Sequence, residues 1–412
     1  MQNTKLEWNE TMNDTVKQIA LQAMEQGGGI LRLAPSWVPR AFCRPGRRLK
    51  LYPNEYYACG LDRGGIDERW IASTTSAANG PCAPEEEGQS RVVTNGGSAA
   101  LLRDVIAELK EEAVGDLWPR HGGWPVFAKF FDNYDALAHH IHHRQAHALR
   151  VNQNTKPEMY FFPAQMNNYT GELPITFFGL NPEVTLQDVK ARLEAFHKGD
   201  NDILSLSRAY KLELDTGWNV PPGLLHAPGS LCTYEPQFAS DISCVFQSVL
   251  HRDRTVDASS LWMNCPDEEI GNYDYLLSLI DFEVNTDPDF HKKYFMRPKP
   301  VLPPAEMLAE GYLDEWICYK NAASSAKRLT VLPGRSVTLA DGVPSGLICI
   351  QGHGRVGSLP VESPTLIHYD QWTNDEFFIT QKAAADGFEV KNLSETEDLV
   401  LLRNFADHPA LR

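Results

Sequence analysis

The sequence predicts a mainly β protein in which helices are confined to a few insertions. Short runs of aromatic and β-branched residues recur along the first 250 positions, as in residues 124–132 and 175–178. Runs of this kind, bounded by glycine, proline or polar turn residues, are typical of strands. With 412 residues, the chain is long enough for two or three domains and a sizeable core.

The C-terminal region gives the clearest strand pattern. Six apolar segments follow one another at roughly even spacing, and turns that contain glycine or aspartate separate them. They are residues 329–332, 336–339, 347–352, 366–369, 376–380 and 399–404. This rhythm predicts an antiparallel sandwich or a small barrel.

Helical periodicity is restricted to four segments. Apolar residues recur every three to four positions in residues 11–26, 101–114 and 185–197, and three glycines follow the first of these segments. The acidic stretch 257–295 is also expected to be helical. A proline-rich segment at residues 297–304 follows it and predicts a domain boundary.

The chain is acidic, with 38 lysines and arginines against 54 aspartates and glutamates and a net charge of −16. This balance argues against a broad surface for nucleic acid or for an anionic membrane. We expect no membrane span, because no stretch approaches the ~18 apolar residues that a crossing helix needs. The N-terminal segment does not resemble a signal peptide, and the eight cysteines occur singly. We therefore expect reduced thiols in a cytoplasmic protein.

Histidines are concentrated in one short segment. Residues 139–147 hold five of the thirteen histidines. Side chains two positions apart on a strand point to the same face, so His140 and His142 can reach one point. Glu158 follows about one hairpin later, and His226 lies on a strand much further along. Three neutral imidazoles and one carboxylate predict a site for Zn²⁺ or another divalent metal such as Fe, Mn, Ni or Co.

Four short motifs occur in a fixed order along the chain. They are GIDERW at residues 65–70, FAKFFD at 127–132 followed by LAHHIH at 137–142, KPE at 156–158, and VPPGLLHA at 220–227. In that order they resemble four motifs of the type I phosphomannose isomerases, which belong to the cupin superfamily. The family motifs are a Gly-Glu-x-Trp strand, a Lys-x-Leu-Asp segment leading to Gln-x-His, a Lys-Thr-Glu motif and a Pro-x-Gly-x-x-His-Ala turn. The resemblance covers residues 30–250, and the C-terminal region follows by domain order.

The resemblance implies two cupin (jelly-roll) barrels with helical insertions. Residues 1–120 would supply an N-terminal helix, strands that complete the first barrel and a helical insert. Residues 121–255 would form the metal-binding core of that barrel, and residues 256–305 a helical segment with the proline-rich connector. Residues 306–412 would form a C-terminal cupin-like β-barrel.

The resemblance also implies roles for individual residues. The metal ligands would be His140, which stands where the family has glutamine, with His142, Glu158 and His226. Lys156 would be the cationic side chain beside the substrate, and Glu68 would line or support the pocket.

One family position is not preserved. Val245 stands where the family has its catalytic arginine, and valine can neither pair with a phosphate nor stabilise a developing enediolate. Arg144, Arg150 and Arg208 are the candidates to replace that arginine.

Moving a proton between adjacent carbons requires a group with a pKa near neutral. His143 or His147 could carry it, since imidazole titrates in that range. A carboxyl group whose pKa is raised by burial, such as Glu235, could do the same.

Together these features predict a metal-dependent aldose–ketose isomerase that acts on a sugar or sugar phosphate through an enediol. The metal would polarise the carbonyl and the adjacent hydroxyl, and Lys156 would stabilise the oxyanion. Two other classes fit the same residues: an oxygenase in which the ligands hold iron, and a non-catalytic sugar-binding or regulatory protein. The expected partner is a small-molecule sugar or sugar phosphate, and the expected assembly is a monomer or a homodimer.

Structural roles are the alternative for several of these residues. The histidine segment could be a hydrogen-bonded set, and His139 and His143 alternate to the face opposite His140 and His142. Residues 351–355 are glycine-rich but lack the strand-to-helix context of a phosphate loop. We expect a barrel hairpin there, with His353 a lesser candidate for a second site.

Overall fold

A computed structural model describes residues 2–168, 171, 173–250 and 254–411, with the side chains of the first helix described from Thr15 onward. Within these residues the strands form four antiparallel sheets of four to nine strands. A two-stranded ribbon adds β15 (Val249–Leu250) and β16 (Arg254–Thr255). The prediction of a mainly β fold is confirmed. No sheet of the described residues closes into a barrel.

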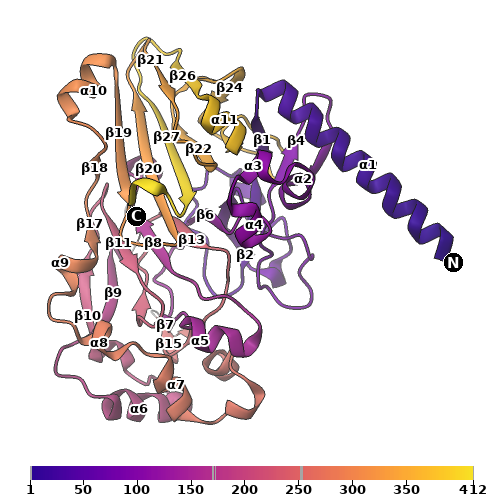
Figure 1. Cartoon of the computed structure of the whole chain (residues 1–412). Coiled ribbons are helices and arrows are strands. Elements are labelled where there is room, and N and C mark those ends of the chain that lie inside the picture. Colours follow the sequence, from indigo (N-terminus) through magenta and orange to yellow (C-terminus); the bar gives the residue numbers. More distant parts are fainter. Residues whose placement is uncertain (1, 169–170, 172, 251–253, 412) are drawn as a thin grey trace.

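A seven-stranded sheet lies near the middle of the molecule (Figure 1). Its strands, in spatial order, are β17 (Phe295–Met296), β11 (Gly217–Val220), β8 (Glu158–Phe161), β13 (Thr233–Phe238), β6 (Val126–Phe131), β3 (Gly65–Ile71) and β2 (Ser36–Arg40). A five-stranded sheet packs on one face of it. That sheet contains β10 (Ser207–Lys211), β9 (Ile175–Leu180), β12 (His226–Ala227), β7 (His140–Ile141) and β14 (Cys244–Val245).

A nine-stranded sheet and a four-stranded sheet make up the other half of the molecule. The larger one contains β18 (Lys299–Pro300), β19 (Tyr312–Cys318), β20 (Ser324–Val331), β27 (Leu399–Ala406), β22 (Ser345–Gln351), β25 (Glu376–Ile379), β1 (Ile30–Ala34), β4 (Arg91–Val93) and β5 (Ala99–Leu101). The smaller one contains β21 (Ser336–Leu339), β26 (Phe388–Asn392), β23 (His353–Val356) and β24 (Leu359–Glu362).

Two of the passages between the halves coincide with prolines. β1 belongs to the nine-stranded sheet and β2 to the seven-stranded sheet, and Pro35 separates them. Proline has no N–H to donate to a strand ladder, which favours a break between two strands at this position. The proline-rich segment 297–304 likewise follows β17 in one sheet and contains β18 of the other.

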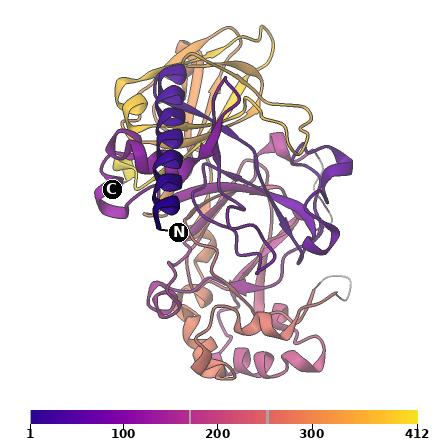
Figure 2. The same ribbon diagram turned by 90° about the vertical axis from the view of Figure 1, so that its right-hand side faces the viewer.

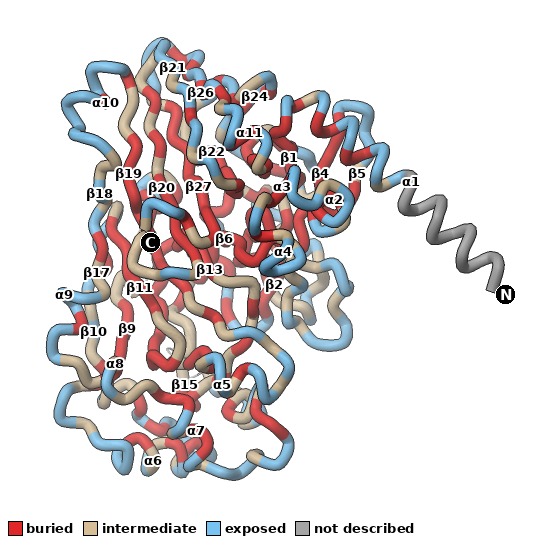
Figure 3. Tube along the Cα trace, viewed as in Figure 1, coloured by how far each residue is buried: buried red, intermediate tan, exposed pale blue. Residues whose placement is uncertain are grey.

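The sheets stack as layers because their strands carry apolar residues on the faces that meet. One core, which includes Phe130, Met159, Tyr234 and Leu402, fills the space between the seven- and nine-stranded sheets. A second core lies between the nine- and four-stranded sheets. A third lies between the seven- and five-stranded sheets and includes Phe178. Figure 3 shows the buried residues concentrated along these central strands.

Helices cover the outside of the layers. They are α1 (Gln2–Gly27), α2 (Leu102–Leu109), α3 (Glu111–Val114), α4 (Leu117–His121), α5 (Gln145–Ala148), α6 (Leu186–Glu194), α7 (Tyr273–Leu279), α8 (Phe282–Thr286), α9 (Phe290–Tyr294), α10 (Pro304–Glu310) and α11 (Gln381–Asp386). α6 and α7 pack on the outer face of the five-stranded sheet, whereas α1 lies beside the other half (Figures 1 and 2). The four segments predicted to be helical all contain helices.

Two local predictions are wrong. Residues 366–369 form no strand, and Ile367 makes only an isolated bridge with Leu51. Residues 351–355 do not form a hairpin. β22, which ends at Gln351, belongs to the nine-stranded sheet, whereas β23, which begins at His353, belongs to the four-stranded sheet. Gly352 makes this corner with φ +80°, a conformation that favours glycine. No helix in the described part of the chain is long and apolar enough to cross a membrane.

Candidate metal centre and adjoining charges

Three histidines meet on the face of the five-stranded sheet that packs against the seven-stranded sheet. His140 on β7 pairs directly with His226 on β12, and residues opposite each other in an antiparallel pair share a face. His142 follows β7 by one residue. The ligand nitrogens of the three side chains lie within 4.8 Å of one another, and the His140 and His226 ring centroids are 4.1 Å apart. The predicted convergence of these three imidazoles is therefore present.

The backbone fixes the orientation of all three rings. Nδ1 of His140 lies 2.7 Å from the carbonyl oxygen of Ala138, and Nδ1 of His226 lies 2.9 Å from that of Leu224. Nδ1 of His142 lies 2.7 Å from the carbonyl oxygen of Ile242. Because a carbonyl can only accept, each Nδ1 carries the proton and each Nε2 presents a lone pair. Metal-binding histidines are held in this way.

Glu158 brings a carboxylate to the same point from β8. Its Oε2 lies 3.2 Å from Nε2 of His142, and its Oε1 lies 3.3 Å from Nε2 of His226. Burial, and then the positive charge of Lys156, lowers the pKa of His142 to about 4, and burial holds the pKa of His140 well below its usual value. Neutral imidazole lone pairs therefore face carboxylate oxygens, an arrangement that a cation stabilises; Lys156 supplies one beside His142, with Nζ 3.4 Å from Nε2 of His142 and 2.7 Å from Oε2 of Glu158. These four side chains fit a divalent transition metal in donor type, number and direction.

A row of alternating charges leads away from this cluster across the seven-stranded sheet. It runs over adjacent strands from β8 through β13, β6 and β3 to β2. We call it the charged row, and its members in spatial order are Glu158, Lys156, Glu235, Lys129, Glu68, Arg40 and Asp241.

Each cation of the charged row lies between two carboxylates. Nζ of Lys156 is 2.7 Å from Glu158 and 3.2 Å from Glu235, and Nζ of Lys129 is 3.5 Å from Glu235 and 3.3 Å from Glu68. The Arg40 guanidinium is 3.0 Å from Glu68 and 3.1 Å from Asp241. These cations are all buried. Strand alternation explains the row, because Phe130 and Tyr234, adjacent to Lys129 and Glu235, point into the apolar core on the other face.

The pKa values along the charged row differ with their surroundings. Burial, together with Glu158, raises the pKa of Glu235 to about 8. Burial alone would raise the pKa of Asp241 as well, but Arg40, Lys129 and Lys156 lower it to about 2. Burial would also raise the pKa of Glu68, but Arg40 and Lys129 lower it, and the pKa of Glu68 lies below its usual value. Glu235 is thus the carboxyl group of the row that is suited to exchange a proton near neutral pH.

Further polar atoms in and beside the row, outside its carboxyl groups, are buried without a hydrogen-bond partner. They include Nε of Arg40 and Oε1 of Gln237, whose side chain shares a face with Glu158 because the two residues pair. Buried polar groups usually have partners, so unpaired atoms beside a cluster of ligands indicate a place for a ligand or water.

The sequence-predicted residues fall into two groups. His140, His142, His226, Glu158, Lys156, Glu235 and Glu68 all lie in the cluster or the charged row. His143 does not: its ring is buried among other residues, beside the thiol of Cys265. His147 lies further away, with Nε2 3.1 Å from Oγ of Ser278. Neither histidine is placed to carry a proton at the cluster.

The three arginines proposed to replace the family arginine also lie elsewhere. Arg144 donates to the carbonyl of Ser278, Arg150 pairs with Glu268 and Glu269, and Arg208 donates to the carbonyls of Asn285 and Asp287.

Val245 does lie beside the cluster. It pairs with His140 in the ladder between β14 and β7, so its side chain shares the face that carries that ligand. An aliphatic side chain therefore occupies the position that the family resemblance assigns to a cation.

Three residues of the charged row were missed by the sequence analysis. Lys129 lies within the FAKFFD motif, and a lysine among five apolar or aromatic strand residues was the signal that could have found it. Asp241 and Arg40 had no such signal, because their pairing joins residues 201 positions apart.

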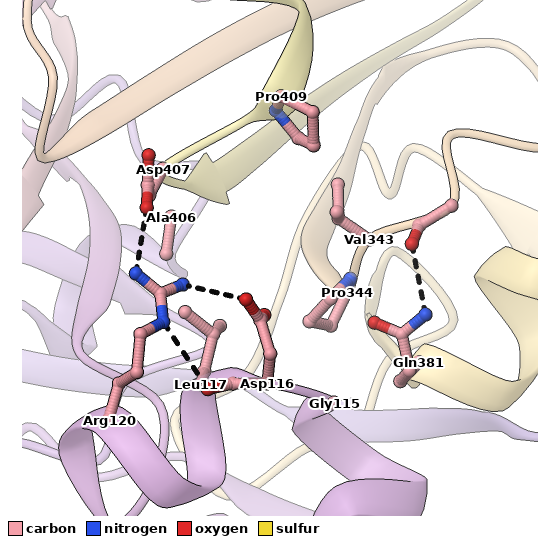
Figure 4. Close-up of a pocket in the computed structure, with 11 residues that line it drawn as sticks. Gly115, Asp116, Leu117, Arg120, Val343, Pro344, Gln381, Ala406, Asp407 and Pro409 are labelled. Carbon is pink, nitrogen blue, oxygen red and sulfur yellow. Dashed lines mark hydrogen bonds and ion pairs between the residues drawn. The ribbon is translucent and has the colours of Figure 1, made fainter. Parts of the chain in front are cut away.

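Other parts of the molecule contribute no comparable cluster of donors among the described residues. His353, the lesser candidate for a second site, is an exposed residue at the corner between β22 and β23. A groove of about 440 Å³ lies between α4, the turn at residues 342–344 and the C-terminal segment (Figure 4). Its charged side chains pair with one another, with Arg120 2.8 Å from Asp407 and 3.4 Å from Asp116.

Solved structures share this fold. A point variant of phosphomannose isomerase from Salmonella typhimurium matches with a TM-score of 0.61 and 13% identity, over 92% of this chain and 100% of that chain. The mannose 6-phosphate isomerase from Bacillus subtilis matches with a TM-score of 0.59 and 12% identity, over 91% of this chain and 99% of that one. No family model and no curated protein matches the sequence. At these identities the likeness establishes a common fold over nearly the whole chain.

Proposed function

We propose that this protein is a metal-dependent sugar isomerase that interconverts an aldose and a ketose through an enediol. The observation that carries the proposal is the meeting of three Nε2 atoms and the Glu158 carboxylate at one end of the charged row. The fold shared with isomerases of mannose 6-phosphate supports the same reaction class.

His140, His142, Glu158 and His226 would hold the divalent cation, with Zn²⁺ as the first candidate. A cation at this point would polarise the carbonyl and the adjacent hydroxyl of the sugar.

Lys156 supplies the positive charge nearest to the ligands. Its Nζ lies 3.4 Å from Nε2 of His142 and 2.7 Å from Oε2 of Glu158. Opposing burial, the two neighbouring carboxylates raise the pKa of this lysine, so it stays protonated at neutral pH. A fixed ammonium group there stabilises the negative charge that develops on the substrate oxygen when a proton leaves the adjacent carbon.

Glu235 is the candidate to move the proton. It is the carboxyl group of the charged row nearest to the ligands without being one of them, and Lys156 and Lys129 flank it at 3.2 and 3.5 Å. A carboxylate in this place can take a proton from one carbon and return it to the neighbouring carbon.

Deuterium incorporation tests the proposal directly. The metal-loaded protein is incubated in D₂O with aldoses, ketoses and their 6-phosphates, and NMR follows exchange at C1 and C2 together with interconversion. We expect metal-dependent exchange that stops when a chelator removes the ion. Absence of both exchange and interconversion across the panel would refute the isomerase assignment, and oxygen uptake by the iron-loaded protein would instead indicate an oxygenase.

A further inference from the structure

We propose that the substrate of this site is an unphosphorylated polyhydroxy sugar, recognised along its chain by the charged row. This inference rests on the proposed function, and it narrows the substrate from sugars and sugar phosphates to the neutral class. It follows from how the charges of the row balance, from the residue beside His140 and from the chemistry of the groups left to bind a ligand.

The balance of charge in the row disfavours a phosphate. In the described part of the chain the row has three cations, Lys156, Lys129 and Arg40, and four carboxylates. Each cation lies within 3.5 Å of two carboxylates. A phosphate dianion that approached Lys156, Lys129 or Arg40 would also approach Glu158, Glu68 or Asp241, the carboxylates with which these cations already pair. Phosphate sites have instead an excess of arginine, lysine or backbone N–H groups.

The residue beside His140 also disfavours a phosphate. Val245 shares the inward face with that ligand and offers neither charge nor a hydrogen-bond donor. The arginines considered as replacements bind backbone carbonyls or surface carboxylates away from the cluster.

The groups of the row are suited to hydroxyls. A sugar hydroxyl both donates and accepts a hydrogen bond, and alternating carboxylates and ammonium or guanidinium groups offer an acceptor and a donor side by side. Nε of Arg40 and Oε1 of Gln237, which are buried and have no hydrogen-bond partner, supply one further donor and one further acceptor. A chain of hydroxyls lying along the row can therefore satisfy its groups without adding net charge.

Binding of sugar alcohols isolates this inference from catalysis, because a polyol has no carbonyl and cannot be isomerised. Calorimetry on the zinc-loaded protein compares mannitol and sorbitol with their 6-phosphate esters. We expect the free polyol to bind at least about tenfold more tightly than its phosphate. Equal affinities, a preference for the ester, or no binding of either polyol would overturn the inference.

Two substitutions test whether the charges around the site set the preference for the free polyol. Val245→Arg introduces a cation beside His140 and should raise the affinity for the polyol phosphate about tenfold, whereas Val249→Arg, the same change on the neighbouring ribbon, should not. Asp241→Asn removes a carboxylate from Arg40 and should also narrow the preference for the free polyol. If both leave the ratio of the two affinities unchanged, the charge balance does not set the preference and the inference fails.

The outcomes separate this inference from the proposed function. Deuterium exchange with the 6-phosphates, combined with tighter binding of the phosphate esters, would support the isomerase and overturn the neutral substrate. Preferential binding of free polyols without deuterium exchange into any aldose would support the ligand class and refute the isomerase.

Discussion

At the scale of single residues, the three-histidine cluster is oriented largely by hydrogen bonds to backbone carbonyls. His140 and His226 each direct Nδ1 to the carbonyl two residues earlier in the chain, which leaves Nε2 free to face the partner side chains. The neutral state of His142 follows from burial and from Lys156, which together hold its pKa at about 4. A cation at this point would therefore be bound by groups that need not lose a proton at neutral pH.

Removing one imidazole should remove most of the metal affinity. His226→Ala takes away a ligand whose Nε2 lies 3.3 Å from Glu158, and we expect at least about a hundredfold weaker Zn²⁺ binding in a competition titration with a chelator. His147→Ala is the matched control, since this histidine contacts Ser278 outside the cluster. Equal loss in both variants would show that the effect is on folding and not on ligation.

Replacing Glu235 should separate chemistry from metal binding. Glu235→Gln keeps the size of the side chain but cannot accept a proton from carbon, so we expect deuterium exchange to fall by about 10²-fold or more. Zinc content should stay unchanged, because Glu235 is not one of the four predicted ligands. Glu213→Gln, which alters an exposed partner of Arg297, serves as the control and should leave exchange unaffected. A normal exchange rate in Glu235→Gln would exclude this residue as the proton carrier.

At the scale of elements, the sequence predicts a site residue well when local spacing determines its direction. His140, His142 and Glu158 follow from strand alternation and short separation, and Glu235 from burial in a strand. Arg40 does not, because its place depends on the pairing of β2 with β3, which contains an irregularity between Val38 and Pro39. The side-chain direction after such a bulge cannot be read from alternation alone.

Strand β19 shows the same limit in the other half of the molecule. Its sequence, YLDEWIC, places two consecutive acidic residues in the middle of a strand, where alternation would call for an apolar residue at one of the two positions. Asp314 is buried because Arg403 pairs with it, and Glu315 because Arg328 does. These arginines lie 89 and 13 positions further along the chain, so the local pattern carries no sign of the burial.

Gly229 follows β12 at a point where the backbone passes very close to another strand. A Cβ atom there would lie 1.8 Å from the carbonyl oxygen of Ile175, which is backbone and cannot move aside. Gly229→Ala should therefore cost about 2 kcal/mol or more, measured by urea denaturation, and should weaken zinc binding by shifting His226. Gly123→Ala is the control, since nothing lies within 4 Å of the place that its methyl group would take, and we expect little change.

The C-terminal turn contains a histidine that should make the protein sensitive to acid. Burial, together with Lys327, lowers the pKa of His408 to about 4 from an ordinary value of 6.5. The unfolded chain binds a proton at higher pH than the folded one, so this contribution is present above pH 6.5 and is lost as the pH falls toward 4. We expect a loss of about 1–2 kcal/mol.

A substitution can isolate this contribution from the other histidines. His408→Phe keeps a ring against Trp316 and Phe405, whose centroids lie 4.8 and 4.9 Å away, but removes the titration. Urea midpoints of the variant should fall less steeply than those of the native protein between pH 6.5 and 4. Parallel curves would contradict the role of His408.

At the scale of the whole molecule, the two halves share one core and one buried ion cluster. Side chains of the seven- and nine-stranded sheets belong to a single apolar core, so we expect both halves to unfold together. Arg69 of β3 reaches across it to the other half. Its guanidinium donates to Asp375 at 2.8 Å and to Glu376 of β25 at 3.0 Å, and all three residues are buried.

Arg69→Met should destabilise the protein strongly, and more so at high pH. Removing the cation leaves buried carboxylates without a partner, which costs about 3–5 kcal/mol. Burial raises the pKa of Glu376 to about 7 even with Arg69 present, so at pH 5 this group is protonated in the folded protein and needs the cation less. Its ordinary pKa is 4.5, and ionisation of the folded state therefore weakens stability as the pH rises from about 4.5 through 7. Without Arg69 that decline in stability should continue to higher pH.

Urea denaturation measures the difference in unfolding free energy between the native protein and Arg69→Met. We expect this difference to be larger at pH 8 than at pH 5. Arg103→Met, which breaks an exposed pair with Asp104, is the control, and its difference should be near zero at both pH values. A difference independent of pH would mean that the protonation of Glu376 does not change between pH 5 and pH 8.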